Sequence, residues 1–110
     1  MYKLCRIDID SREEIDLELK AFVKDLKEKF PIKTIYLYGS FARGDIHEGS
    51  DIDLLIIGDF KERFIERIGI ILNLTSLPIE PLVYTEREFQ DMIKNKNPFI
   101  LEILKYAVEL

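Results

Sequence analysis

The feature that most constrains the fold is the apolar run Leu-Leu-Ile-Ile at residues 54–57, which follows directly on the aspartates Asp51 and Asp53. Successive side chains of a strand point to opposite faces of a sheet, so a strand without polar positions must be covered on both faces. We therefore predict a buried strand over residues 51–57. Two carboxylates at the start of such a strand are costly unless a positive charge lies between them. This stretch is the first candidate for a functional site.

The rest of the chain divides into helices and strands. A capping pattern at residues 11–14 precedes apolar residues at helical spacing, and Pro31 ends that run. Residues 32–38 and 79–84 are β-branched and aromatic and predict two further strands. Capping patterns at 59–62 and 85–88 predict two more helices. Asn97-Pro98 predicts the start of a last helix, whose apolar face reaches Val108. The residues of this face assigned to the core, with a partner surface as the alternative, are Phe99, Ile100, Ile103 and Leu104. Residues 2–9 alternate weakly and indicate an additional edge strand.

The predicted order is helix, strand, strand, helix, strand, helix, helix, with no internal repeat and no linker. A chain of 110 residues is long enough for one core. We predict a single domain over residues 1–110, in the α/β class, built from layers of helices and strands.

Composition excludes several classes of protein. The net charge of −5 provides no general attraction for nucleic acid, and no basic stripe is visible, so direct nucleic-acid binding is not expected. The apolar runs are far shorter than the roughly 20 residues of a membrane helix, and no secretory segment is visible at the N-terminus. We therefore expect a cytoplasmic protein without membrane contact. The single cysteine, Cys5, excludes an internal disulfide and a cysteine-based metal cluster.

Asp51 and Asp53 are two positions apart in the predicted strand, so their side chains share one face. Two carboxylates at that distance repel each other unless a cation binds both. Oxygen ligands suit hard divalent ions, and Mg²⁺ in particular is usually held by one or two carboxylates together with phosphate oxygens. The pair could hold one metal ion or share in a pair of ions.

Gly39 and Ser40 end the predicted strand 32–38 and precede Asp51 by a spacer of ten residues. Glycine permits a tight turn and a close approach of a ligand to the backbone. Ser40 adds a hydroxyl group, the next residues can start a helical turn whose free N–H groups suit an anion, and Arg43 is a candidate phosphate ligand. Each feature alone is common at turns. Together with the two aspartates, they provide the phosphate-binding and metal-binding groups that phosphoryl or nucleotidyl transfer needs.

The stretch GSFARGDIHEGSDIDLLII resembles the signature of the polymerase-β-type nucleotidyltransferase superfamily, which is Gly-Ser, a spacer of about ten residues, then Asp-x-Asp. The short chain and the sequence of this motif resemble those of the minimal nucleotidyltransferases, the antitoxin half of paired HEPN/MNT systems. The resemblance implies a small mixed β-sheet flanked by helices. It also implies two Mg²⁺ ions and the transfer of a nucleoside monophosphate from a triphosphate such as ATP, with release of pyrophosphate.

Carried over to this chain, the resemblance assigns the triphosphate to Gly39 and Ser40. Arg43 matches the arginine often found after Gly-Ser, and Asp51 and Asp53 match the metal ligands. The third carboxylate of the family corresponds to Glu80, where the usual residue is Asp. A misplacement of about 1 Å can cost on the order of a hundredfold in rate, and the neighbouring Pro81 indicates an edge strand or a bulge. Whether Glu80 works as a base and ligand is therefore left open.

The resemblance implies an Mg²⁺-dependent enzyme that moves AMP from ATP to a protein hydroxyl group. The implied acceptor is a tyrosine of a HEPN-type ribonuclease toxin, which this chain would silence as the antitoxin. Two alternatives stay open. One is a pseudoenzyme that neutralises its partner by binding alone, an interpretation motivated by Glu80. The other is a detached subunit of a kanamycin-nucleotidyltransferase-like enzyme with a small-molecule acceptor. No motif marks the base, the acceptor residue or the oligomeric state.

Overall fold

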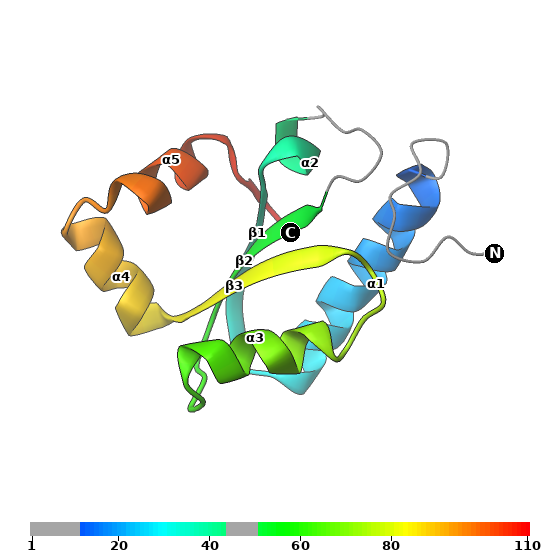
Figure 1. The fold of residues 1–110 in the computed structure, drawn as a ribbon, viewed down its shortest axis with the longest axis horizontal. Coiled ribbons are helices and arrows are strands. Elements are labelled where there is room, and N and C mark those ends of the chain that lie inside the picture. Colours follow the sequence, from blue (N-terminus) through cyan, green and yellow to red (C-terminus); the bar gives the residue numbers. More distant parts are fainter. Residues whose placement is uncertain (1–11, 44–50) are drawn as a thin grey trace.

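The computed structural model describes residues 12–43 and 51–110, in which five helices and four strands follow one another (Figure 1). This confirms the predicted α/β class. The predicted strand at residues 2–9 and the capping pattern at 11–14 begin outside the described residues. The elements are α1 (Arg12–Lys29), β1 (Ile32–Tyr38), α2 (Ser40–Arg43), β2 (Ile52–Gly58), α3 (Phe64–Leu72), β3 (Ile79–Thr85), α4 (Glu86–Lys94), α5 (Pro98–Tyr106) and β4 (Val108–Glu109).

The four strands form one mixed sheet in the order β3-β2-β1-β4. Strand β1 runs antiparallel to β2 and to β4, whereas β2 and β3 are parallel and are joined through α3. Pro81 lies on β3, which is an edge strand, so that half of the expectation for Pro81 is confirmed. The alternative of a bulge is wrong, because the β2–β3 register is continuous from Ile52 opposite Ile79 to Gly58 opposite Thr85.

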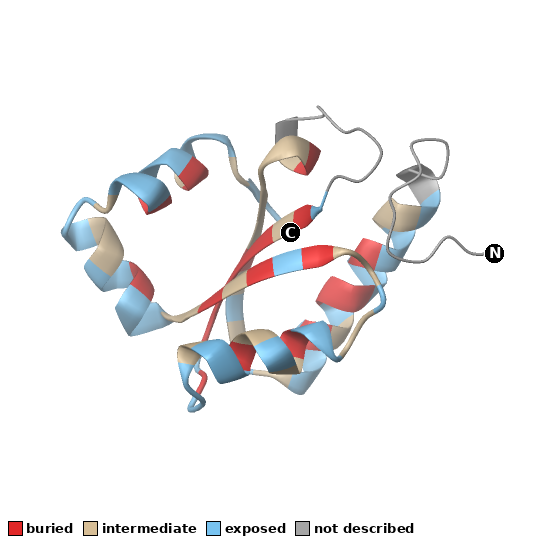
Figure 2. Cartoon of the chain, in the orientation of Figure 1, coloured by how far each residue is buried: buried red, intermediate tan, exposed pale blue. Residues whose placement is uncertain are grey.

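Helices cover both faces of the sheet. On one face, Leu54 and Ile56 of β2 belong to a core that includes residues of α1 and α3. On the other face, Leu55 and Ile57 pack with residues of α4 and α5. Figure 2 shows the buried residues along the central strands. The apolar run at 54–57 is thus buried on both sides, as predicted.

One predicted helix start is wrong. The capping pattern at 59–62 is not used, and α3 begins at Phe64, where the Glu66 side chain accepts a hydrogen bond from the backbone N–H of Arg63 at 3.0 Å. The reason is Phe60, which is buried and stacks against Phe30 with 5.8 Å between ring centroids. With the Phe60 ring held in the core, the helix begins only at Phe64.

The last helix also ends earlier than the sequence pattern indicates. Helix α5 stops at Tyr106, and Val108 lies in β4, where it pairs with Leu37 of β1. The backbone N–H of Leu110 donates to the carbonyl oxygen of Ile35 at 2.8 Å. Residues 108–110 therefore pair with the free edge of β1 instead of continuing the helix. Phe99 is 53% exposed, so its assignment to the core is wrong, whereas the assignment of Ile100 and Ile103 is confirmed, because both are buried.

Among the described residues, no helix is long and apolar enough to cross a membrane.

Candidate active site

The strand directions bring the distant sequence candidates to one end of the sheet (Figure 1). Strand β1 ends at Tyr38, and Gly39 and Ser40 follow it. Because β1 is antiparallel to β2, this end of β1 lies beside the start of β2, where Asp51 and Asp53 are found. Strand β3 is parallel to β2, so its start, with Glu80, lies at the same end. The fold thus places the backbone of Gly39-Ser40 and the three candidate carboxylates at the same end of the sheet.

The register aligns two of these carboxylates with a tyrosine across neighbouring strands. Asp53 lies opposite Tyr38 of β1 and opposite Glu80 of β3. Residues directly opposite each other point to the same face of a sheet, which here is the face covered further along by α4 and α5. Asp53 is half-buried, whereas Asp51 and Glu80 are exposed. Glu80 is therefore aligned with Asp53 even though it stands where the family pattern has Asp.

Gly39 has the positive φ angle of 73° that favours glycine, and its backbone lies against Asp53. A Cβ atom at residue 39 would overlap Oδ2 of the Asp53 carboxylate. The turn therefore needs glycine for two reasons, its backbone angle and this close approach. The same packing places the Gly39 peptide next to the carboxylate that the sequence assigns to metal binding.

Ser40 is the first residue of α2, and the next residue, Phe41, is 3% exposed and belongs to the core. The buried ring fixes α2 to the sheet and so fixes the position of Ser40 after the turn. Arg43 is the last residue of α2, but its side chain lies outside what the structure describes. Its predicted contact with phosphate stays a prediction.

Tyr38 is a further candidate that the sequence analysis missed. Burial raises the pKa of its phenol above the usual value, and the negative charges of Asp53 and Glu80 and the neighbouring Tyr84 raise it further. Tyr38 is therefore a protonated hydroxyl group at neutral pH, able to donate a hydrogen bond beside the carboxylates. Only the strand register reveals this role, because nothing in the local sequence distinguishes Tyr38 from other strand tyrosines.

The carboxylates suit a hard divalent cation in charge and in donor type. Burial is the main cause of the raised pKa of Tyr38, and the negative charges of Asp53 and Glu80 add to it. Carboxylate oxygens are the ligands that Mg²⁺ prefers. In residues 12–43 and 51–110, no three His, Cys, Asp or Glu side chains form a group ready to hold a metal ion. Mg²⁺ is usually held by one or two carboxylates and takes its other oxygens from phosphate and water.

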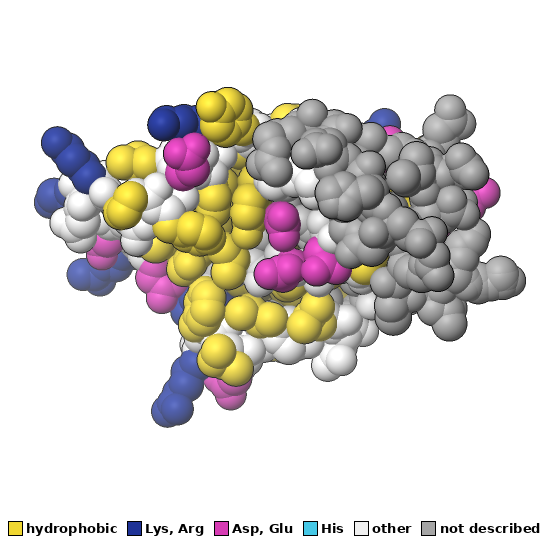
Figure 3. All heavy atoms as spheres, turned by 45° about the horizontal axis from the view of Figure 1, so that its top comes forward, with side chains coloured by type: hydrophobic (Ala, Val, Ile, Leu, Met, Phe, Trp, Pro, Cys, Tyr) yellow, Lys and Arg dark blue, Asp and Glu magenta, His cyan; other side chains and the backbone are white. Residues whose placement is uncertain are grey.

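A pocket of about 320 Å³ adjoins Gly39. It lies between the end of β1 and α5, and Figure 3 shows acidic side chains grouped beside hydrophobic ones on this side of the molecule. The sequence analysis missed the pocket, because the side chains of α5 were assigned to the core. The pocket is lined by Tyr38, Gly39, Phe99, Glu102, Ile103 and Tyr106.

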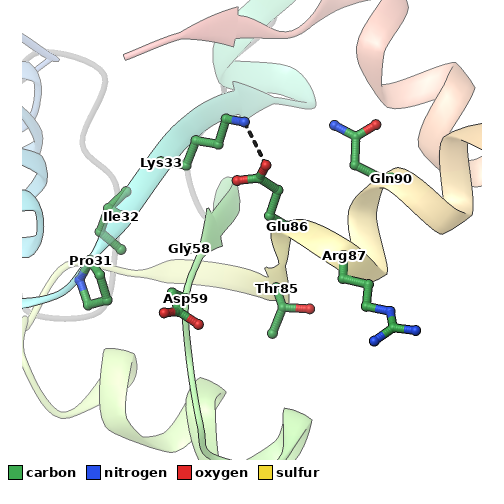
Figure 4. Close-up of a pocket in the computed structure, with 9 residues that line it drawn as sticks. All are labelled: Pro31, Ile32, Lys33, Gly58, Asp59, Thr85, Glu86, Arg87 and Gln90. Atoms are coloured by element: carbon green, nitrogen blue, oxygen red, sulfur yellow. Dashed lines mark ion pairs between the residues drawn. The ribbon is translucent and has the colours of Figure 1, made fainter.

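A larger pocket of about 730 Å³ lies at the opposite end of the sheet (Figure 4). Its lining includes Gly58 at the end of β2 and Thr85 at the end of β3, whereas Asp53 and Glu80 are near the starts of these strands. Lys33 and Glu86, which also line it, form an ion pair with 2.9 Å between Nζ and Oε1. The pocket is thus separated from the carboxylates by the length of the strands, so it is not the candidate active site.

Comparison with known families gives one match over most of the chain. Residues 19–108 match the model of the nucleotidyltransferase domain family. The matched part contains Gly39, Ser40, Asp51, Asp53 and Glu80.

Two curated relatives are similar over parts of their length. A candidate protein adenylyltransferase of Methanocaldococcus jannaschii is 58% identical over 65 residues, covering 50% of this chain and 65% of that protein. The protein adenylyltransferase MntA of Thermococcus cleftensis is 44% identical over 50 residues, covering 46% of this chain and 48% of that protein. The matches therefore span less than two thirds of each relative.

One solved structure has a similar fold. The crystal structure of a candidate nucleotidyltransferase from Sulfolobus solfataricus superposes with a TM-score of 0.65 and covers 99% of this chain and 87% of that chain. The sequence identity is 23%. The likeness is thus one of fold, and it extends over nearly the whole chain.

Proposed function

Because this chain belongs to the nucleotidyltransferase domain family, we propose that it transfers AMP from ATP to a hydroxyl group of another protein. The observation that carries the proposal is the position of Asp53. This carboxylate is aligned with Glu80 across β2 and β3 and lies against the backbone of Gly39. The turn that we propose binds phosphate is thereby adjacent to a carboxylate that could hold a metal ion, and this adjacency supports phosphoryl transfer.

The binding roles follow from this arrangement. The backbone of Gly39 and the hydroxyl group of Ser40 would bind the triphosphate, and Arg43 would add a positive charge. Asp51 and Asp53 would hold two Mg²⁺ ions, with Glu80 as the third carboxylate. When bound, such ions neutralise phosphate charge and polarise the phosphoryl oxygens.

In the proposed reaction, the acceptor oxygen forms a bond to the α-phosphorus of ATP. The bond from that phosphorus to the oxygen bridging to the β-phosphate breaks, and pyrophosphate leaves with the electron pair. Glu80 would take the proton of the acceptor hydroxyl group. Its exposure supports this role, because an acceptor on another folded protein has to reach it from solvent.

The proposed acceptor is a tyrosine of a HEPN-type ribonuclease toxin, which makes this chain an antitoxin. Two features support a protein acceptor. The relatives from Methanocaldococcus jannaschii and Thermococcus cleftensis are named for protein adenylylation. The pocket beside Gly39, at about 320 Å³, is at the lower end of the range of about 300–1,000 Å³ typical of small-molecule sites. It has little room for a nucleotide and a second small substrate together.

A labelling experiment tests the proposal. The purified protein is incubated with Mg²⁺, ATP labelled at the α-phosphate, and the protein encoded next to it. The double variant Asp51→Asn/Asp53→Asn removes the proposed metal ligands. Asp59→Asn is the matched control, because Asp59 is an exposed carboxylate at the other end of β2. We expect label on the neighbouring protein with the wild type and with Asp59→Asn, but not with the double variant.

Other outcomes contradict the proposal in distinct ways. Neutralisation of the toxin by the double variant, without any label, would mean that binding alone is the function. Label on a small molecule would mean that the acceptor is not a protein.

A further inference from the structure

The pocket beside Gly39, named here the α5 pocket, is continuous with the proposed nucleotide site. Its lining combines the β1 end, Tyr38 and Gly39, with one face of α5. Gly39 therefore belongs both to the turn proposed to bind the triphosphate and to the pocket. If the phosphates of a ligand lie at Gly39 and Ser40, the rest of that ligand can extend into this pocket.

The α5 side of the pocket is an aromatic and apolar stripe. Phe99, Glu102, Ile103 and Tyr106 are spaced at i, i+3, i+4 and i+7, so they share one face of the helix. Ile103 is buried, whereas Phe99 is 53% exposed and Tyr106 is 61% exposed. Two large aromatic side chains are thus presented to solvent at the edge of a pocket. Aromatic faces with a few polar groups are the lining that a flat aromatic ligand requires.

Glu102 is the charged residue among those that line the pocket. It forms an ion pair with Lys105 at 3.5 Å, and both side chains are 63% exposed, so the pair adds little stability and does not hold Glu102 in place. An ionised carboxylate only accepts hydrogen bonds. It therefore favours a ligand that donates, such as one with an exocyclic amino group.

We propose that the α5 pocket binds the nucleobase of the triphosphate substrate, with the base against Phe99 and Tyr106 and its amino group donating to Glu102. The proposal rests on the proposed nucleotidyl transfer, because it takes the triphosphate to lie at Gly39 and Ser40. Adenine, guanine and cytosine carry an exocyclic amino group, whereas uracil does not. The pocket thus selects amino-substituted bases over uracil.

Binding measurements with and without a base test this assignment. The affinity of the full chain with Mg²⁺ is measured for ATP and for inorganic triphosphate, which has no base. We expect Phe99→Ala and Tyr106→Ala each to weaken ATP binding about tenfold, as for other base-stacking side chains, and to leave triphosphate binding unchanged. Tyr106→Phe keeps the ring and should bind ATP as the wild type does. Leu101→Ala is the matched control, because Leu101 is exposed on α5 but does not line the pocket.

The base preference gives a second measurement. We expect the wild type to bind ATP more tightly than UTP, and Glu102→Gln to reduce that ratio, because an amide can donate as well as accept. An unchanged ratio would contradict the role of Glu102.

Several results would overturn the assignment. The first is that the wild type binds ATP no more tightly than inorganic triphosphate. The second is that Phe99→Ala and Tyr106→Ala weaken the binding of ATP and of triphosphate equally, and the third is that they weaken neither. If Tyr106→Ala leaves ATP binding intact but raises the KM for the acceptor protein, the pocket binds the acceptor instead. These experiments measure binding and not transfer. If the variants weaken ATP binding as expected but no label is transferred, the proposed function is refuted and the assignment of the pocket to the base still holds.

Discussion

Replacing Arg67 by methionine removes a buried cation that joins helix α3 to β3 and α4. Arg67 lies on α3 and is 6% exposed. Its Nε donates to the carbonyl oxygen of Glu62 at 2.7 Å, and Nη1 donates to the carbonyl oxygen of Val83 on β3 at 3.2 Å. Nη1 and Nη2 also donate to the two carboxylate oxygens of Glu88 on α4, at 2.7 and 3.4 Å.

The expected cost follows from what these groups lose. Removing one partner of a fully buried ion pair costs about 3–5 kcal/mol. The Glu88 side chain is 44% exposed, so water replaces part of its interaction, and the cost is reduced accordingly. The carbonyl oxygen of buried Val83 still loses a donor. We therefore expect Arg67→Met to lower the free energy of unfolding by about 2–3 kcal/mol.

The same interaction gives a pH dependence. The hydrogen bond from Arg67 lowers the pKa of Glu88, and hydrogen bonds with Thr85 add to this against the opposing effect of burial. A carboxyl group whose pKa is lower in the folded state stabilises the fold at pH values above its ordinary pKa of about 4.3. That stability is lost as the pH falls through the lowered pKa of folded Glu88. Arg67→Met should therefore flatten the acid side of the stability profile.

Urea unfolding measured from neutral to acid pH tests both parts. Arg87→Met is the matched control, because Arg87 is an exposed arginine on α4, and it should change the free energy of unfolding by less than about 0.5 kcal/mol. An Arg67→Met protein as stable as this control would refute the reasoning. So would an unchanged acid side of the profile.

Three further predictions concern the site and its support. Gly39→Ala should lower stability by about 1–3 kcal/mol and abolish ATP binding, because the backbone has a positive φ and a Cβ atom would overlap the Asp53 carboxylate; thermal unfolding and ligand titration measure the two effects. Gly69→Ala should instead raise stability by about 0.4–1 kcal/mol in the same unfolding assay, because Gly69 is exposed within α3 and nothing lies within 4 Å of the added Cβ. Glu80→Gln should lower the rate of label transfer by a factor on the order of 100, with ATP binding largely retained, if Glu80 is the base.

Each of these has an outcome that would count against it. A stable, ATP-binding Gly39→Ala protein would mean that the turn can relax away from the carboxylate. A Gly69→Ala protein less stable than the wild type would mean that α3 is constrained at this position. Full activity of Glu80→Gln would remove Glu80 from the mechanism.

The elements themselves were largely predictable from the sequence, because they depend on neighbouring residues. The apolar run at 54–57 required cover on both faces, and the structure buries it between two helical layers. The capping pattern at 85–88 depends on local hydrogen bonds alone, and it is found as predicted, with Thr85 and Glu88 each accepting from the backbone N–H of the other. The motif residues Gly39 and Ser40, with Asp51 and Asp53, were identified by type and spacing, although their roles await the labelling experiment.

The tertiary structure decided everything that depends on which segments become neighbours. The start of α3 moved because Phe60 had first to be buried against Phe30. The end of the last predicted helix became β4 because β1 had a free edge. Tyr38 became part of the site only because the register sets it opposite Asp53, which is in turn opposite Glu80. Caps and periodicity are properties of adjacent residues, whereas register, edge pairing and pockets arise from contacts between residues far apart in the chain. The sequence by itself therefore determined most of the elements and the candidate chemistry, because these depend on neighbouring residues. Contacts within the folded sheet decided the remaining element boundaries and which side chains meet.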